Sequence, residues 1–178
     1  MKTNKNVVFI ALQIISWIIF IGLSIEAGAL LVNFIISVFK PELIQNLYEK
    51  MDLSSVYNEN KFIFYGMYSF ALYISVLKAV MFYFVILLVQ KIDLSQPFNR
   101  FVSEKISKIS YMALSIGIIS IIATQIGKNM MHHGYDFDRL SKYWSDSTGF
   151  ILMAAVVYII ALIFKKGIEL QEENDLTV

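Results

Sequence analysis

Residues 7–39 read VVFIALQIISWIIFIGLSIEAGALLVNFIISVF, and Glu26 is the single ionisable side chain among them. About 20 apolar residues are enough to cross the roughly 30 Å hydrocarbon core of a bilayer. The stretch is longer than that, so it predicts a membrane-spanning helix that tilts or extends beyond the bilayer. It also runs far past the roughly 7–15-residue apolar core of a signal peptide, and we therefore expect an uncleaved first helix.

Three further apolar stretches follow, and each is a candidate crossing. The second, residues 62–89, also exceeds the length that a crossing needs. The third and fourth are shorter and would use interfacial residues to complete their crossings. The sequence therefore predicts an all-α, integral membrane four-helix bundle that forms a single domain over residues 1–178, with crossings at about 7–39, 62–89, 109–127 and 148–164.

The composition supports a membrane protein. Of the 178 residues, 57% are hydrophobic and 16% are charged, and the mean hydropathy is +0.63, whereas about 25% of the residues in soluble domains are charged. The net charge of +1 provides no field that would attract nucleic acid, so we expect no direct nucleic acid binding. The chain has no cysteine, which excludes disulfides, thiolate nucleophiles and cysteine-ligated metals.

The distribution of basic residues predicts the orientation. The N-terminus, the central linker and the tail together carry eight Lys and Arg, and the other two connections carry six. Cytoplasmic connections hold the excess of positive charge in most membrane proteins. We therefore expect both termini and the central linker in the cytoplasm, with residues 40–61 and 127–147 outside.

Two charged residues lie deep within the first two stretches. Glu26 and Lys78 should lie at depths that differ by roughly 4–5 Å, since a helix rises 1.5 Å per residue. A buried lone charge is costly, so we predict an intramembrane ion pair that fixes the bundle. Two alternatives remain: each charge is hydrated separately in an internal cavity, or both line a route for protons or ions.

The third crossing carries a row of small side chains. They recur at alternating spacings of three and four, which places them on one helix face, and they are Ser110, Ala113, Gly117, Ser120, Thr124 and Gly127. Small residues let two helix backbones approach closely in a membrane. The row predicts a close helix neighbour at this face.

The segment before the third crossing predicts an amphipathic interfacial helix over residues 97–110. Pro97 suits its first position, apolar and polar residues fall on opposite faces, and Lys105 interrupts the apolar face. The cytoplasmic tail, residues 165–178, passes from two bases to an acidic end. We predict a partner-binding surface made of linker and tail residues Phe98, Arg100, Phe101, Lys105, Glu169, Glu172, Glu173 and Asp175.

Catalytic and metal-binding patterns are weak. His132 and His133 lie near Asp136 and Asp138, but this spacing matches no zinc or calcium site. No phosphate-binding glycine loop, dinucleotide fingerprint or nucleophile elbow is present. We expect no metal, no cofactor and no enzymatic activity. The aromatic residues of the two outer connections, Phe64, Phe137, Tyr143 and Trp144 among them, are interpreted chiefly as anchors at the membrane interface, and a small outer cap is the alternative.

The linker and the tail carry a resemblance to a known family. Gln96–Val102, the basic segment Lys105–Tyr111 and the tail Lys165–Val178 after an apolar helix resemble the DUF2975 family of bacterial four-helix membrane proteins. The resemblance implies a multi-pass protein of the bacterial inner membrane without an established reaction, often encoded beside a small Xre-type helix-turn-helix regulator. We therefore expect a non-enzymatic membrane anchor or sensor for such a regulator. The alternative is a small transporter, channel or accessory subunit with a polar route past Glu26 and Lys78.

Overall fold

The computed structural model describes residues 7–46, 52–92 and 97–175, and the regular structure within them is entirely helical. Four of the helices are long and apolar enough to cross a membrane, so the chain is a multi-pass membrane protein. In chain order the elements are α1 (Val7–Phe39), η1 (Pro41–Asn46), α2 (Ser54–Glu59), α3 (Lys61–Lys91), α4 (Arg100–His132), α5 (Asp138–Ser141) and α6 (Ser147–Asp175).

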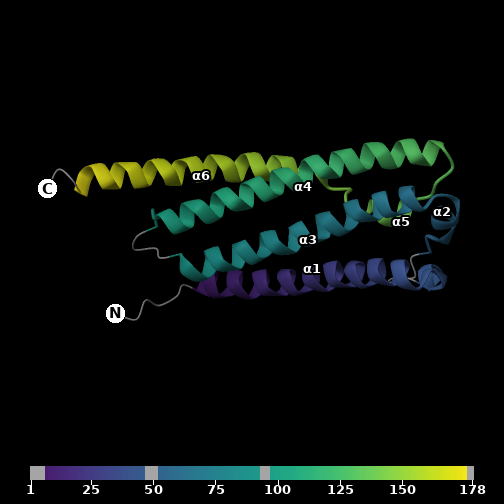
Figure 1. Cartoon of the computed structure of the whole chain (residues 1–178). Coiled ribbons are helices and arrows are strands. Elements are labelled where there is room, and N and C mark those ends of the chain that lie inside the picture. Colours follow the sequence, from purple (N-terminus) through teal and green to yellow (C-terminus); the bar gives the residue numbers. More distant parts are fainter. Residues whose placement is uncertain (1–6, 47–51, 93–96, 176–178) are drawn as a thin grey trace.

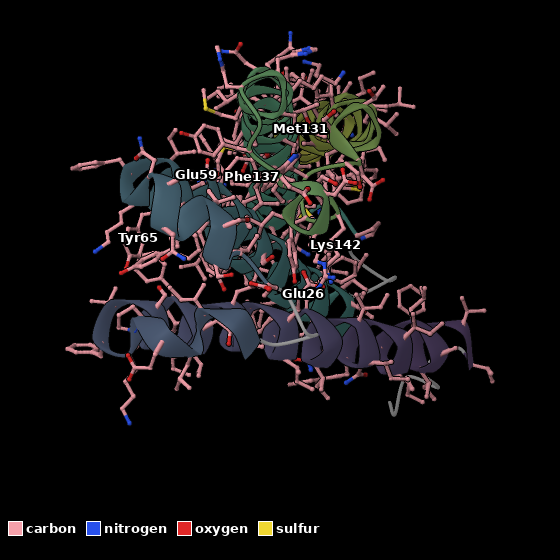
Figure 2. All side chains as sticks on the ribbon, turned by 90° about the vertical axis from the view of Figure 1, so that its right-hand side faces the viewer. Glu26, Glu59, Tyr65, Met131, Phe137 and Lys142 are labelled. Carbon is pink, nitrogen blue, oxygen red and sulfur yellow. The ribbon has the colours of Figure 1, made fainter. Side chains whose placement is uncertain are left out.

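The four long helices follow one another in a row. α1 packs against α3, α3 against α4, and α4 against α6 (Figure 1). α1 and α6 therefore lie at the two ends of this row. Figure 2 looks nearly along α4 and α6 and shows α1 running across the view, so α1 crosses the other helices obliquely. This arrangement leaves α1 and α6 apart, with α5 and its flanking residues between them on one side of the molecule.

Polar side chains fix the register of α1 against α3. The Tyr68 hydroxyl, fully buried, donates to the carbonyl oxygen of Leu30 at 3.0 Å, and the Tyr65 hydroxyl donates to that of Ser37 at 3.1 Å. A helix in hydrocarbon loses stability if a polar group lacks a partner, so these bonds hold the two helices in one alignment.

The predicted row of small residues on the third crossing is confirmed as a helix contact. A Cβ atom on Gly117 would lie 2.5 Å from Cγ1 of Ile151 and 3.2 Å from the backbone oxygen of Ser147. The Ser110 hydroxyl donates to the Ala154 carbonyl oxygen at 2.9 Å. Most of the row is buried, so α4 and α6 approach as closely as the small side chains predict.

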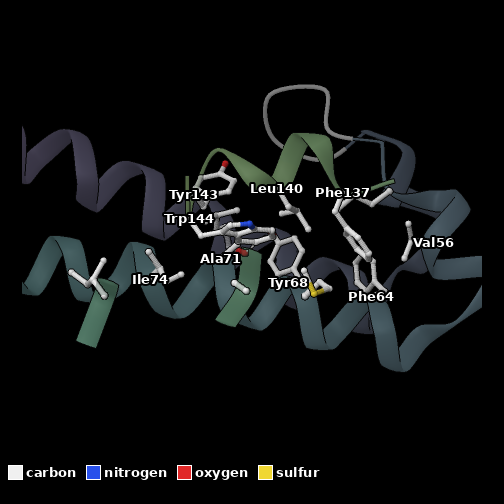
Figure 3. Close-up of a cluster of buried hydrophobic side chains, with 14 of the residues drawn as sticks. Val56, Phe64, Tyr68, Ala71, Ile74, Phe137, Leu140, Tyr143 and Trp144 are labelled. Atoms are coloured by element: carbon white, nitrogen blue, oxygen red, sulfur yellow. Dashed lines mark hydrogen bonds between the residues drawn. The ribbon is translucent and has the colours of Figure 1, made fainter. Parts of the chain in front are cut away.

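The connection between α4 and α6 folds back into the helices. Phe137, Leu140, Tyr143 and Trp144 are at most 3% exposed and pack in one cluster with α3 (Figure 3). Phe64 of α3, in the same cluster, is fully buried as well. The interpretation of these aromatic residues as interface anchors is wrong, because they form part of the core.

The linker and the tail extend the last two long helices. Asn99 caps α4 by accepting a hydrogen bond from the Val102 amide at 2.9 Å, so the helix begins at Arg100 and not at Pro97. α4 then continues without a break to His132. The predicted linker helix and third crossing are therefore one helix. α6 likewise continues as a helix beyond its apolar residues to Asp175.

Candidate functional site

Lys78 lies near the middle of α3, 17 residues after Lys61 and 13 before Lys91. Its ammonium group donates a hydrogen bond to the Tyr143 carbonyl oxygen at 3.0 Å. It also lies 5.4 Å from the centroid of the Phe150 ring, a distance suited to a cation–π interaction. The partners of this lysine therefore come from the connection before α6 and from α6 itself.

Glu26 reaches the same region from α1, where Figure 2 shows it rising towards α5. Its carboxylate accepts a hydrogen bond from the Ser75 hydroxyl at 3.2 Å. Ser75 and Lys78 are three residues apart and so share a face of α3. The carboxylates of Glu26 and Asp146 are both near enough to act electrostatically on the Lys78 ammonium group.

The structure does not place the predicted pair, Glu26 and Lys78, in direct contact. No described hydrogen bond or ion pair joins Glu26 to Lys78, since Glu26 is held by Ser75 and Lys78 by the Tyr143 carbonyl. The Glu26 carboxylate therefore acts on the Lys78 ammonium group by electrostatic attraction. Asp146, an exposed residue of the connection before α6, also acts electrostatically on Lys78.

The depth of this site follows from the packing of α4 against α6. The backbone oxygen of Ser147 would lie 3.2 Å from a Cβ on Gly117, which is 15 residues before the end of α4 at His132. At 1.5 Å per residue, that separation is about 22 Å along the helix axis. Residues 143–147 therefore lie level with the middle of α3 and α4. This midpoint cluster, Glu26, Ser75, Lys78, the Tyr143 carbonyl and Asp146, is the candidate functional site.

A second group of charged residues lies where the start of α4 meets the end of α6. Arg100 and Glu172 form an ion pair at 2.8 Å, and Lys166 pairs with Glu169 at 3.0 Å. The Phe98 ring packs on Phe164 with centroids 5.3 Å apart and occupies the space that a Cβ on residue 167 would need. We call this assembly, Phe98, Arg100, Phe164, Lys166, Gly167, Glu169 and Glu172, the α4–α6 clasp.

Lysines and aromatic rings surround the same end of α3 and α4. Lys105 lies 4.8 Å from the Phe84 ring centroid and 5.3 Å from that of Phe101. Lys91 lies 4.7 Å from the Phe101 ring. Lys105 therefore places its ammonium group against aromatic faces where it interrupts the apolar side of the helix.

The predicted partner-binding residues are thus brought to one end of the molecule, but several already contact one another. Arg100, Glu169 and Glu172 are in ion pairs of the clasp, and Phe98 packs against Phe164. Phe101 is half-buried and Glu173 is exposed. Asp175 ends α6, and its side chain lies outside the described part of the structure.

His132, His133, Asp136 and Asp138 are all exposed, at the end of α4 and in the residues that follow it. The Asp136 carboxylate accepts a hydrogen bond from the Asp138 amide at 2.9 Å, which is a local turn contact. Among residues 7–46, 52–92 and 97–175, no group of three or more His, Asp or Glu side chains is arranged to hold a metal ion.

Sequence reasoning missed two members of the midpoint cluster. The Tyr143 carbonyl carries no side-chain signal. Asp146 lies in a connection whose return to the middle of the helices is not evident from its composition. Ser75 could be found because it lies with Lys78 on one face of the second crossing.

Comparisons with known proteins identify the family. A family model described as protein of unknown function (DUF2975) matches residues 46–178, about three quarters of the chain. No curated protein and no solved structure matches. The matched region includes α3 to α6, with Lys78 and its Tyr143 partner, whereas α1 with Glu26 precedes it. The chain is therefore a member of the DUF2975 family.

Proposed function

We propose that this protein is a non-enzymatic membrane anchor or sensor of the bacterial inner membrane, with both termini in the cytoplasm. It would hold a cytoplasmic helix-turn-helix regulator at the joined ends of α4 and α6. The observation that carries the proposal is the continuation of α6 as a helix through its acidic residues to Asp175, braced against α4 by the Arg100–Glu172 ion pair. This end is a preformed surface on which a partner can dock.

The chemistry of this end suits a basic partner. Glu169, Glu172 and Glu173 are exposed along the last turns of α6, and Leu170 beside them is 50% exposed. A DNA-binding protein carries a basic face that neutralises phosphates. Acidic residues around an apolar contact complement such a face, so that docking here would compete with DNA.

The internal ion pairs do not block this role. Arg100 and Glu172 are 79% and 54% exposed in their pair, and exposed pairs contribute at most about 1 kcal/mol. A partner arginine or lysine can therefore replace Arg100 or Lys166 at little cost. The proposal also requires the docking strength to fall as salt concentration rises.

Charge reversal tests the proposal. The triple variant Glu169→Lys, Glu172→Lys, Glu173→Lys should reduce co-purification of the neighbouring-gene regulator from detergent by at least about tenfold, because like charges would face each other. A matched reversal of Glu42, Asp52 and Glu59, which lie at the opposite end, should leave co-purification unchanged.

A further variant tests whether regulator binding depends on the acidic surface or on the ion pair of the clasp. Arg100→Ala removes the ion pair but keeps every carboxylate, so regulator binding should persist. If the triple reversal binds the regulator as well as the unaltered protein does, the docking surface is wrong. Loss of binding with Arg100→Ala alone would show that the clasp, and not the acidic surface, matters.

A transporter, channel or accessory subunit is the second candidate, and the midpoint cluster favours it. Glu26 and Lys78 are ionisable side chains within the spanning helices α1 and α3, and such residues often mark an ion or proton route. This function predicts ion or proton flux in liposomes that Lys78→Met abolishes. An anchor predicts no flux in either form.

A further inference from the structure

Three lysines lie together where the end of α3 runs beside the start of α4 (Figure 1). The ammonium groups of Lys91 and Lys105 are 4.7 Å and 5.3 Å from the centroid of the Phe101 ring. Those of Lys105 and Lys108 are 4.8 Å and 5.8 Å from the centroid of the Phe84 ring. Because Lys105 shares a ring with each of the other two, the three positive charges form one group. We call these three residues the lysine cluster.

The lysine cluster lies at the boundary of the spanning segments. Residues 109–127 of α4 contain no charged side chain; Lys108 directly precedes them and Lys128 directly follows them. About 20 residues cross the hydrocarbon core, so this stretch fills the core and Lys108 lies at one edge of it. Lys91 ends α3, and residues 79–90 before it are also uncharged. The ammonium groups of the cluster therefore lie at the level of the phospholipid headgroups.

A row of aromatic rings from α1 and α3 marks the same level. Trp17 packs on Phe20 with ring centroids 5.8 Å apart, and Phe20 packs on Tyr83 at 6.1 Å. Tyr83 in turn lies 6.1 Å from Phe84, whose ring contacts two lysines of the cluster. Trp17 and Tyr83 are 40% and 45% exposed. Partly exposed Trp and Tyr side chains are enriched at membrane interfaces, so this row supports the placement of the lysine cluster there.

The lysine cluster has no acidic partner within the part of the chain that the structure describes. No ion pair joins any of its three ammonium groups to a carboxylate. Glu104, the acidic residue next to the cluster along α4, is exposed and acts electrostatically on Arg100. Like charges held this close repel one another. An anion that contacts all three lysines would therefore stabilise the end of α3 against the start of α4.

We propose that the lysine cluster binds the headgroup of an anionic phospholipid. The phosphate oxygens of the lipid accept hydrogen bonds from the ammonium groups, and the lipid supplies this anion at the depth where the lysines lie. Basic pockets between spanning helices bind anionic headgroups in this way. A headgroup with a net negative charge, such as that of phosphatidylglycerol, is preferred to phosphatidylcholine, because the choline cation repels the lysines. This inference does not depend on the regulator proposed above.

Lipid retention by the full chain tests the proposal. The protein is reconstituted without the regulator in nanodiscs that hold equal amounts of phosphatidylglycerol and phosphatidylcholine. It is then extracted into detergent, and native mass spectrometry counts the lipids that stay bound. The unaltered chain should retain phosphatidylglycerol at least about tenfold more often than phosphatidylcholine, because each lysine near an anionic headgroup favours binding by about fivefold.

Glutamine variants locate the site. The triple variant Lys91→Gln, Lys105→Gln, Lys108→Gln should lower the retention ratio to about one. The single variant Lys108→Gln changes one exposed residue, so it should fold even if the triple variant does not, and it should lower the ratio by about fivefold. The matched control Lys40→Gln, Lys61→Gln, Lys128→Gln removes three exposed lysines from the opposite ends of α1, α3 and α4 and should leave the ratio unchanged.

Equal retention of the two lipids by the unaltered chain would overturn the proposal, and so would an unchanged ratio in a folded variant of the lysine cluster. Inorganic phosphate, added in excess during extraction, separates the two sources of a phosphate group. Phosphatidylglycerol should stay bound in its presence, whereas its displacement would show a site for soluble phosphate instead. Each of these results is obtained without the regulator and leaves the docking proposal to its own test.

Discussion

Replacing Gly117 with leucine is expected to destabilise the protein by about 3 kcal/mol, because the larger side chain overfills a packed contact. Even a single methyl group there would meet Cγ1 of Ile151 at 2.5 Å and the backbone nitrogen of Ile151 at 3.1 Å. A side chain can rotate away, but a helix backbone must move as a whole. α6 would therefore have to shift away from α4 along their closest contact.

Gly28→Leu is the matched control. Gly28 is a helical glycine of α1 with nothing within 4 Å of the Cβ position, so leucine there faces open lipid-side space. The same substitution should be neutral or slightly stabilising, since glycine is a poor helix former. The free energy of unfolding of both variants is measured by denaturant titration in detergent micelles and compared. Equal stabilities would show that α4 and α6 do not pack as described.

Lys78→Met is expected to cost about 2 kcal/mol. Methionine keeps the length and apolar stem of the side chain, so the change removes mainly the ammonium group. The Tyr143 carbonyl would lose its hydrogen bond, and Glu26 and Asp146 would lose their shared counter-charge. The segment before α6 should then separate more readily from α3.

Two other variants show whether charge at this position is what matters. Lys61→Met removes an exposed lysine from the first turn of the same helix and should change stability little. Glu26→Gln keeps a hydrogen-bond acceptor for Ser75 and should cost less than Lys78→Met. The same denaturant titration measures all three. A Lys78→Met protein as stable as the Lys61→Met protein would mean that Lys78 holds nothing in place.

The fold could be predicted from sequence largely because hydrocarbon imposes simple rules. A spanning helix must be long and apolar, so α1, α3, α4 and α6 are visible as apolar stretches. Close helix packing requires small side chains, so the row through Ser110 and Gly117 identified the α4 face that meets α6. Both signals are local and periodic.

The site could be predicted only in part, because its geometry depends on a contact between α3 and the connection before α6, which are far apart in the sequence. Glu26 and Lys78 were identifiable as costly charges, yet their partners could not be. The lysine bonds to a backbone carbonyl 65 residues away, to which no residue type gives a clue. The aromatic residues of the connection between α4 and α6 were wrongly interpreted for the same reason. Tyr143 and Trp144 have the composition of interface anchors, but the chain carries them into the core.

The central claim is that the connection before α6 reaches the middle of the helices and bonds to Lys78. Solid-state NMR can measure it in lipid bilayers, with ¹⁵N in the lysine side chains and ¹³C in the tyrosine carbonyls. The hydrogen bond of 3.0 Å predicts strong dipolar dephasing between Nζ and a carbonyl carbon, and Lys78→Met should remove it. Dephasing that is absent, or that survives this substitution, would contradict the account.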